Sequence, residues 1–479
     1  MRRLSNILVI SVFWSGVYGL SQFALSYFSE IHQDLSNAMT PRELANPNLQ
    51  WGRLLPFVNL PDGSILTVDT VIDPIFGLVF ALYLFSLFYS RQWFKSTMQK
   101  VYGRLGLLIG LCLVAVGATF SHHLLRSSLL PYKHICHPSP LSVGRLSQVD
   151  TSYGYTLLPF ARTFQMAPPA DPIPGFTNGD GFRVLPEQVR QSSATGKVDI
   201  LFLGCSFTFG ALCKADSIFP HLSSQALGFR YINAGVSGWG LAQMQRRAKE
   251  LIPKYKPRYV VFQYSYWLPQ RAAGTYRHVF DYPLPKPYYD VLPSGAFALS
   301  KPPFTSRVFE FDTDSAMHRY QGHPIRYLLQ SGVPSKVLSD DIQRFQVWWQ
   351  RLTGRIHPVT TAPEQMEALS RQVYTELLGL SRENGSVPLI LHLSPQHQVF
   401  EPYPSFLSPA DTSLYIDGMA WHKKYLKENP SASMNIEFMH WRIHHGDTVI
   451  VDQHPNHLSH HLISQSIAAR VRRMEEKLK

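Results

Sequence analysis

Apolar residues follow two different patterns along the chain. The first quarter contains three long apolar runs, at 7–28, at 71–89, and at 105–120 with an extension toward Leu130. Beyond residue 197 the apolar runs are short and alternate with amphipathic stretches. A run of about 20 apolar residues can span a bilayer, whereas a short run bounded by glycine or proline is typical of a buried parallel strand. The pattern therefore predicts a membrane anchor at 1–130, followed by an α/β domain.

Basic residues predict the orientation of this anchor. Arg2 and Arg3 precede the first run, and the loop between the second and third runs has no acidic residue among its basic ones, Arg91, Lys95, Lys100 and Arg104. Cytoplasmic loops are enriched in lysine and arginine, so the amino terminus and this loop are expected in the cytoplasm. The chain is then a multi-pass protein of the cell membrane, with about three transmembrane helices and its remainder on the periplasmic or extracellular side. If the first run were instead a cleaved signal peptide, the same remainder would be exported.

The part after the anchor divides into a lead-in and a catalytic domain. Residues 131–196 are rich in proline, glycine and polar residues, which predicts an extended lead-in with turns. Within 197–479, strands are predicted at 200–203, 230–232, 258–264, 387–393 and 448–451. Helices are predicted between and after them, at 216–227, 241–252 with Pro253 as its end, 363–383, 413–428 and 457–476. This alternation indicates βαβ units and a parallel sheet.

One stretch of the catalytic domain interrupts the alternation. Residues 268–361 are rich in proline and aromatic residues, and a helix is expected around 341–351. We interpret this stretch as an insertion over the site.

Charge and cysteine usage exclude several function classes. The net charge is +12 and the pI about 9.4, but the basic residues are dispersed and form no nucleic-acid module, so no nucleic-acid partner is expected. The four cysteines have no zinc spacing, and the sequence alone does not decide whether Cys136 and Cys213 pair. His457, His460 and His461 lack the carboxylate pattern of a metalloprotease, and most of these histidines are expected on a solvated helix face. The sequence therefore predicts neither a metal nor a cofactor.

Candidate chemistry lies where predicted strands end. Ser206 follows the apolar run 200–203, and Gly204 permits a tight exit from the strand. Open α/β sheets bind their ligands at such carboxyl ends. A serine nucleophile also needs a base and an acid that orients this base, and Asp452 and His454 follow the run 448–451.

Three sequence blocks occur in a recognisable order. They are Gly204-Cys-Ser-Phe-Thr-Phe-Gly210, Asn233-Ala-Gly-Val-Ser-Gly238 and Asp452-Gln-His-Pro-Asn456. Together they resemble the SGNH (GDSL-like) hydrolase superfamily, over about 197–479 apart from the insertion. In the lead-in, Tyr153-Gly-Tyr155 and Asn178-Gly-Asp-Gly-Phe-Arg183 are similar to the segment before the first block in membrane-anchored and exported members. The resemblance implies a three-layer α/β/α fold with a flavodoxin-like parallel sheet.

The resemblance also implies a role for each matched residue. Ser206 matches the nucleophile, His454 the general base and Asp452 the acid that orients the imidazole. The backbone amides of Ser206 and Gly238 match two donors of the oxyanion hole.

The chain departs from the family pattern at two positions. Cys205 stands where the family has an aspartate before the nucleophile. The third block of the family ends in an asparagine that completes the oxyanion hole, whereas this chain has Trp267 near that position. Ser265 and Gln263 are the candidates for this missing donor.

These residues imply a membrane-anchored, outward-facing serine ester hydrolase. Its substrate would be an acyl ester of an envelope or extracellular carbohydrate or lipid. The same triad would also serve an O-acyltransferase that modifies a cell-surface polysaccharide together with a membrane-bound O-acyltransferase partner. A third hypothesis, based on the missing asparagine, is that the chain is a catalytically weakened binding or scaffold protein.

Overall fold

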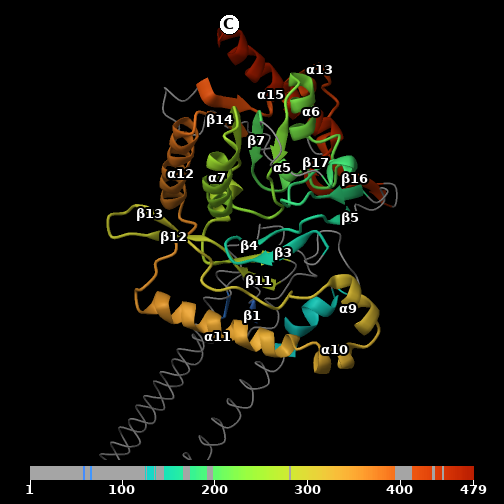
Figure 1. Cartoon of the computed structure of the whole chain (residues 1–479), viewed down its shortest axis with the longest axis vertical. Helices are drawn as coiled ribbons and strands as arrows, with labels where there is room; N and C mark the ends of the chain where they lie inside the picture. The colour runs from blue at the N-terminus through green and yellow to red at the C-terminus, as the bar shows by residue number, and fades with distance from the viewer. Residues whose placement is uncertain are drawn as a thin grey trace, which may run out of the picture. The chain divides into compact units, whose positions relative to one another are not determined.

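The fold comes from a computed structural model of the whole chain (Figure 1). The structure describes residues 58–59, 65–66, 124–125, 127–133, 135, 145–165, 173–190, 198–279, 282–393, 413–433, 437–444 and 447–478. The chain forms two compact units, Met1–Ser128 and Leu129–Lys479, and the second unit contains all predicted site residues. The three apolar runs predicted to span the membrane lie outside the described residues. Among the residues that are described, none of the helices has the length and apolar character needed to cross a bilayer.

A parallel five-stranded sheet forms the centre of the second unit. Its spatial order is β15-β14-β9-β7-β8, with strands at Tyr415–Asp417, Val387–His392, Tyr259–Tyr264, Ile200–Leu203 and Tyr231–Asn233. Numbered along the chain, this order is 2-1-3-4-5, which is the flavodoxin-like arrangement. The first strand, β7, is buried along its whole length and has the second and third strands on either side. The α/β fold with a parallel sheet is therefore confirmed.

Helices cover both faces of this sheet (Figure 1). One face carries α7 (Leu241–Tyr255) and α12 (Pro363–Glu383), which pack against each other. The other face carries α6 (Phe219–Leu227), α13 (Ala420–Glu428) and α15 (His457–Leu478), with α15 in contact with both of the others. The apolar residues of the strands and of these helices form one large core. The unit thus has the three layers expected.

Two predicted elements near the carboxyl terminus differ in part from the structure. The stretch expected to be one helix contains the strand β15 before α13, because a three-residue strand is too short to show a period and forms only by pairing with β14. The strand predicted at 448–451 is part of β17 (Asp447–Pro455), which lies outside the parallel sheet. It pairs instead with the adjacent β16 (Met439–His444) as an antiparallel hairpin.

A third correction concerns Pro253, which lies inside α7 and does not end it. A proline within the last turn removes only one helical hydrogen bond, so the helix continues to Tyr255.

The lead-in and the insertion consist mainly of hairpins and short helices. The lead-in forms the hairpins β3 (Ser147–Asp150) with β4 (Gly154–Leu157), and β5 (Arg162–Gln165) with β6 (Ile173–Phe176), followed by the turn η2 (Pro186–Gln188). The insertion begins with α8 (Trp267–Gln270) and continues with β10 (Tyr276–Val279), β11 (Tyr282–Pro285), β12 (Tyr288–Val291) and β13 (Phe297–Ser300). It ends with α9 (Thr313–Tyr320), α10 (Pro324–Gln330) and α11 (Val333–Leu352), so the helix expected at 341–351 starts earlier. In the first unit, β1 (Val58–Asn59) pairs with β2 (Ile65–Leu66).

Candidate active site

Ser206 begins the short helix α5 (Ser206–Phe209), directly after the turn that leaves β7. Gly204 forms this turn in close contact with other parts of the chain, because a Cβ there would lie 2.2 Å from Thr208 Oγ1. Gly210 ends the helix in the left-handed region at φ 77°. Ser206 is 4% exposed and lies at the carboxyl end of β7, where the strand order has its switch point between β7 and β9.

The Gln263 side chain stabilises this turn through hydrogen bonds. Its Oε1 accepts hydrogen bonds from the Cys205 backbone amide at 3.0 Å and from Thr208 Oγ1 at 2.8 Å. Its Nε2 donates to Cys205 Sγ at 3.2 Å and to Ser265 Oγ at 2.9 Å, and Ser265 Oγ donates to the carbonyl of Leu393 at 2.6 Å. The donors of Gln263 and Ser265 are thus directed to the chain itself. Both fully buried side chains support the turn, and neither aims a donor at an oxyanion.

The second sequence block is bonded to the nucleophile turn. Val236 N–H donates to the Gly204 carbonyl at 3.3 Å, and Asn233 Nδ2 donates to the Thr208 carbonyl at 2.9 Å. Gly235 lies so close to α5 that a Cβ there would be 2.5 Å from the Phe209 nitrogen. This loop therefore packs closely against α5 and is hydrogen-bonded to it.

Gly238, the candidate oxyanion donor, has a backbone that only glycine adopts without strain. Its φ is 80°, and a Cβ would lie 2.5 Å from Tyr155 Oη. Tyr155 Oη donates to the Ser237 carbonyl at 2.8 Å, and its own carbonyl accepts a hydrogen bond from Trp239 Nε1 at 3.1 Å. The lead-in thereby binds the peptide group before Gly238 and the indole of the residue after it.

The third block lies beside α5. The imidazole of His454 is half-buried, and its centroid is 5.5 Å from that of Phe207, the residue after the nucleophile. β17 and α5 are in contact, although 248 positions separate Ser206 and His454 in the sequence. The backbone of Asp452 lies in β17 opposite His440, and its side chain is outside the described part. The structure thus brings His454 next to the helix of Ser206.

The segment after α5 connects the first block with the third and with the lead-in. Cys213 Sγ donates to the Pro455 carbonyl at 3.4 Å, and Cys136, whose pairing with Cys213 the sequence left open, lies outside the described residues. Arg183, which belongs to the second lead-in motif, donates to the Cys213 carbonyl. Its guanidinium also lies 4.3 Å from the ring centroid of Phe209, and burial lowers its pKa to about 10. Both lead-in motifs therefore support the site.

Cys205, which replaces the family aspartate, lies in a polar environment although it is fully buried. Burial acts to raise the pKa of its thiol, but the positive charge of Arg271 and the N–H groups of Phe207, Trp267 and Gln263 hold it below the usual value. The Ser206 hydroxyl is oriented toward this sulfur at 3.8 Å. Cys205 is thus an acceptor within the turn.

Arg271 is a site residue that the sequence analysis missed. It follows α8, and its Nη1 donates to the Trp239 carbonyl at 3.4 Å. Gly240 permits this approach, because a Cβ there would lie 2.7 Å from the Cβ of Arg271. The insertion therefore contributes a positive charge near Cys205. No sequence pattern distinguishes this arginine from the other dispersed basic residues.

His460 is the exception to the solvated face expected for most of the histidines of α15. His457 and His461 are exposed, but His460 is fully buried and its Nδ1 accepts a hydrogen bond from the Phe219 amide at 3.2 Å. Burial lowers the pKa of His460 well below its usual value, and nearby basic groups, Arg183 first among them, lower it further. This histidine connects α15 to the start of α6. In the part of the chain that the structure describes, no cluster of three or more His, Cys, Asp or Glu residues could hold a metal ion.

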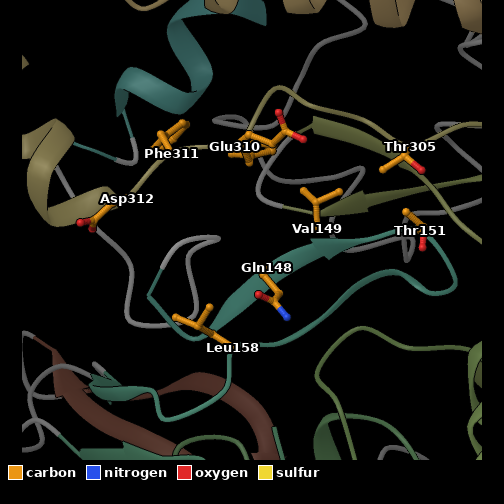
Figure 2. Close-up of a pocket in the computed structure, with 9 residues that line it drawn as sticks. Gln148, Val149, Thr151, Leu158, Thr305, Glu310, Phe311 and Asp312 are labelled. Atoms are coloured by element: carbon orange, nitrogen blue, oxygen red, sulfur yellow. The ribbon is translucent and has the colours of Figure 1, made fainter. Parts of the chain in front are cut away.

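A separate cavity of about 530 Å³ lies between the lead-in and the insertion (Figure 2). Its lining comes from Gln148, Val149, Thr151 and Leu158 on one side and from Thr305, Phe309, Glu310, Phe311 and Asp312 on the other. None of the predicted catalytic residues lines it, so this cavity is distinct from the Ser206 site.

Comparison with known proteins yields only distant structural likeness. No family model and no curated protein matches the chain. A protein from Desulfitobacterium hafniense DCB-2, described as lipolytic and of the G-D-S-L family, is 11% identical with a TM-score of 0.23; the match covers 57% of this chain and 99% of that one. LAE5, an alpha/beta hydrolase from the metagenome of Lake Arreo, Spain, is 14% identical with a TM-score of 0.28, over 58% of this chain and 97% of that one. The function is therefore argued from the residues of this chain.

Proposed function

We propose that the chain is a membrane-anchored serine hydrolase that cleaves acyl esters of an envelope or extracellular carbohydrate or lipid. One observation carries the proposal: three blocks far apart in the sequence converge on the four-residue helix that begins with Ser206. The chain supplies a hydroxyl, an imidazole and a glycine amide with a positive φ near the carboxyl end of β7. This set of groups suits acyl transfer through a covalent intermediate.

In the proposed reaction, Ser206 Oγ attacks the ester carbonyl while His454 accepts the hydroxyl proton. Asp452, two residues before His454, is proposed to orient the imidazole. The amides of Ser206 and Gly238 stabilise the oxyanion, and the alcohol leaves with the proton that His454 returns. Water then attacks the acyl-enzyme, His454 again acts as the base, and a carboxylic acid is released.

The oxyanion hole in this proposal has two backbone donors. The side-chain donors of Gln263 and Ser265 already bind other groups of the chain. Loss of one oxyanion donor costs about 10² to 10³ in rate, so the site would be slower than one with three donors but still active.

Reaction with a fluorophosphonate probe tests the nucleophile. We expect the full-length protein in detergent to be labelled and Ser206→Ala to lose the label completely, because the probe forms a bond only with an activated serine. Ser335→Ala, at an exposed serine of α11, is the matched control and should be labelled like the wild type. Well-folded wild-type protein that stays unlabelled would contradict both the hydrolase and the O-acyltransferase hypotheses, and it would favour a binding or scaffold protein.

The acceptor of the acyl group requires a second measurement. Attack by water releases a free carboxylic acid, whereas attack by a sugar hydroxyl gives an acylated glycan. Both reactions use the same Ser206 intermediate, so mass spectrometry of the products formed with and without a polysaccharide acceptor distinguishes the hydrolase from the O-acyltransferase.

A further inference from the structure

An apolar stripe runs along the outer face of α11. Five large apolar side chains lie at spacings of four and three residues, with exposed fractions of 40% for Leu338, 52% for Ile342, 38% for Phe345, 47% for Trp349 and 59% for Leu352. This spacing places them along one side of the helix. A helix of a water-soluble domain normally buries such a stripe, so this one indicates a binding surface.

The opposite side of α11 shows that the outward orientation of the stripe is fixed. Asp340 and Arg344 are buried, and Asp340 accepts hydrogen bonds from Ser306 Oγ at 2.6 Å and Tyr282 Oη at 3.0 Å. Arg344 pairs with Asp341 and donates to the Pro283 carbonyl. Turning the stripe inward would break this buried network. The stripe is therefore built to face outward.

Neighbouring residues extend this surface and determine its charge. α10 is joined to α11 by two residues, Ser331 and Gly332, and exposes Ile325 and Leu329. The other exposed positions of α11 are polar but uncharged: Ser335, Ser339 and Gln346. From 324 to 355, the exposed residues that carry a charge are Arg326 and Arg355, both basic. We call residues 324–355 the α10–α11 face. It combines apolar residues and tryptophan with positive charge, as interfacial membrane helices do.

This face contacts a segment that lies close in sequence to the predicted anchor. Residues 127–133 are helical, and the ring of Tyr132 packs on Tyr327 of α10 with 5.1 Å between centroids. Tyr132 lies twelve residues after Phe120, where the core of the third predicted span ends. The α10–α11 face therefore contacts a residue only twelve positions along the chain from the third predicted span.

From these observations we infer that the α10–α11 face docks onto the surface of the lipid bilayer in which the chain is anchored. The apolar stripe enters the interface, and Arg326 and Arg355 face anionic headgroups. A second copy of the chain fits less well, because the stripe is only about two heptads long and an independent coiled coil needs about three to four. Two of the partly exposed charged residues of α11, Lys336 and Asp341, already pair within the chain with Glu310 and Arg344, so they are poorly placed to select a helical partner. The inference rests on the proposed membrane anchor and is independent of the proposed chemistry.

Depth-dependent quenching tests the docking in the full-length protein. Phe345→Cys and, as the matched control on the adjacent polar side, Ser339→Cys each receive a fluorophore in a background with Cys112→Ser and Cys136→Ser. In nanodiscs of phosphatidylcholine and phosphatidylglycerol, doxyl groups on the lipid chains should quench the label at 345 at least about threefold more than the label at 339. Ile342→Glu with Trp349→Glu should abolish this difference, whereas Ser339→Glu with Gln346→Glu should preserve it. All four substituted positions are exposed, so the fold should be retained.

Three outcomes would overturn docking. Equal quenching of both labels by aqueous iodide means that the face is solvated. Shielding of the label at 345 from both quenchers means that protein covers it, and dependence of this shielding on protein concentration would identify a second copy. A difference that survives Ile342→Glu with Trp349→Glu means that the stripe is not responsible.

Failure of the proposed function can be distinguished from failure of the docking. Retention of the full chain in membranes after alkaline carbonate extraction reports on the anchor, and fluorophosphonate labelling reports on Ser206.

Discussion

Gln263 and Gly238 support the chemistry of Ser206 by different physical means. Gln263 accepts two hydrogen bonds from the turn that presents the nucleophile, and it is fully buried. Gly238 has a positive φ and lies against Tyr155 Oη. At the scale of the residue, the site therefore depends on the hydrogen bonds of the Gln263 side chain and on the absence of a Cβ at Gly238.

Replacing Gln263 by leucine should destabilise the second unit. The substitution leaves the buried Cys205 amide and the Thr208 hydroxyl without their acceptor, and each unsatisfied buried group costs about 1 to 3 kcal/mol. Chemical unfolding of the full chain in detergent should show a loss of about 2 to 5 kcal/mol. Gln225→Leu, at an exposed glutamine of α6, is the control, and an equal loss in both variants would refute the role of Gln263.

Replacing Gly238 by alanine should reduce activity more than stability. The added Cβ collides with Tyr155 Oη and shifts the amide proposed for the oxyanion hole, so the labelling rate should fall about 10- to 100-fold. Gly228→Ala is a close control, since Gly228 also has a positive φ, 69°, but has open space around its Cα and lies at the end of α6. An unchanged labelling rate in Gly238→Ala would exclude this glycine from the oxyanion hole.

Two buried histidines connect the helices on one face of the sheet. His460 of α15 accepts a hydrogen bond from the first residue of α6, and His422 of α13 lies 2.7 Å from Ser459 Oγ. Burial lowers the pKa of His422 to about 3. At the scale of the element, the packing of α6, α13 and α15 thus requires neutral imidazoles.

The free energy of unfolding should fall as the pH is lowered. Both histidines have a pKa below that of the unfolded chain, so the unfolded state binds their protons first. The stability that they contribute is complete above about pH 6.5 and declines toward about pH 3, by up to about 1.4 kcal/mol per pH unit for each group. Denaturant unfolding between pH 7 and pH 4 should show this slope, and His422→Asn should reduce it. His457→Asn, at an exposed position of α15, serves as the control, and an unreduced slope in His422→Asn would assign the effect to other groups.

The whole molecule combines a predicted anchor with the unit Leu129–Lys479, and orientation is a property at this scale. The basic loop at 91–104 predicts that the second unit is exported. An alkaline phosphatase reporter, which is active only outside the cytoplasm, should be active when fused after Leu130 or after Lys479. The same reporter fused within the basic loop should be inactive. The reverse pattern would invert the topology and would place the proposed site in the cytoplasm.

The sequence by itself determined the features that depend on neighbouring residues. The short apolar runs predicted four of the five sheet strands, because burial of both faces leaves a local pattern of apolar residues. Glycines and the three blocks marked the turns at strand ends, because tight turns require particular residue types. The flavodoxin-like order followed only from the family resemblance, and the pairing of the strands confirms it.

Only the tertiary structure decided which distant groups meet. The partner of His460 is 241 residues away in the chain, and Gln263 is 58 residues from the turn that it supports. β17 pairs with the adjacent β16 and not with the parallel sheet. The apolar stripe of α11 faces outward because Asp340, on the other side of the helix, is hydrogen-bonded to buried residues of the insertion. Burial and hydrogen bonding depend on what the folded chain places nearby, and no local pattern contains that information.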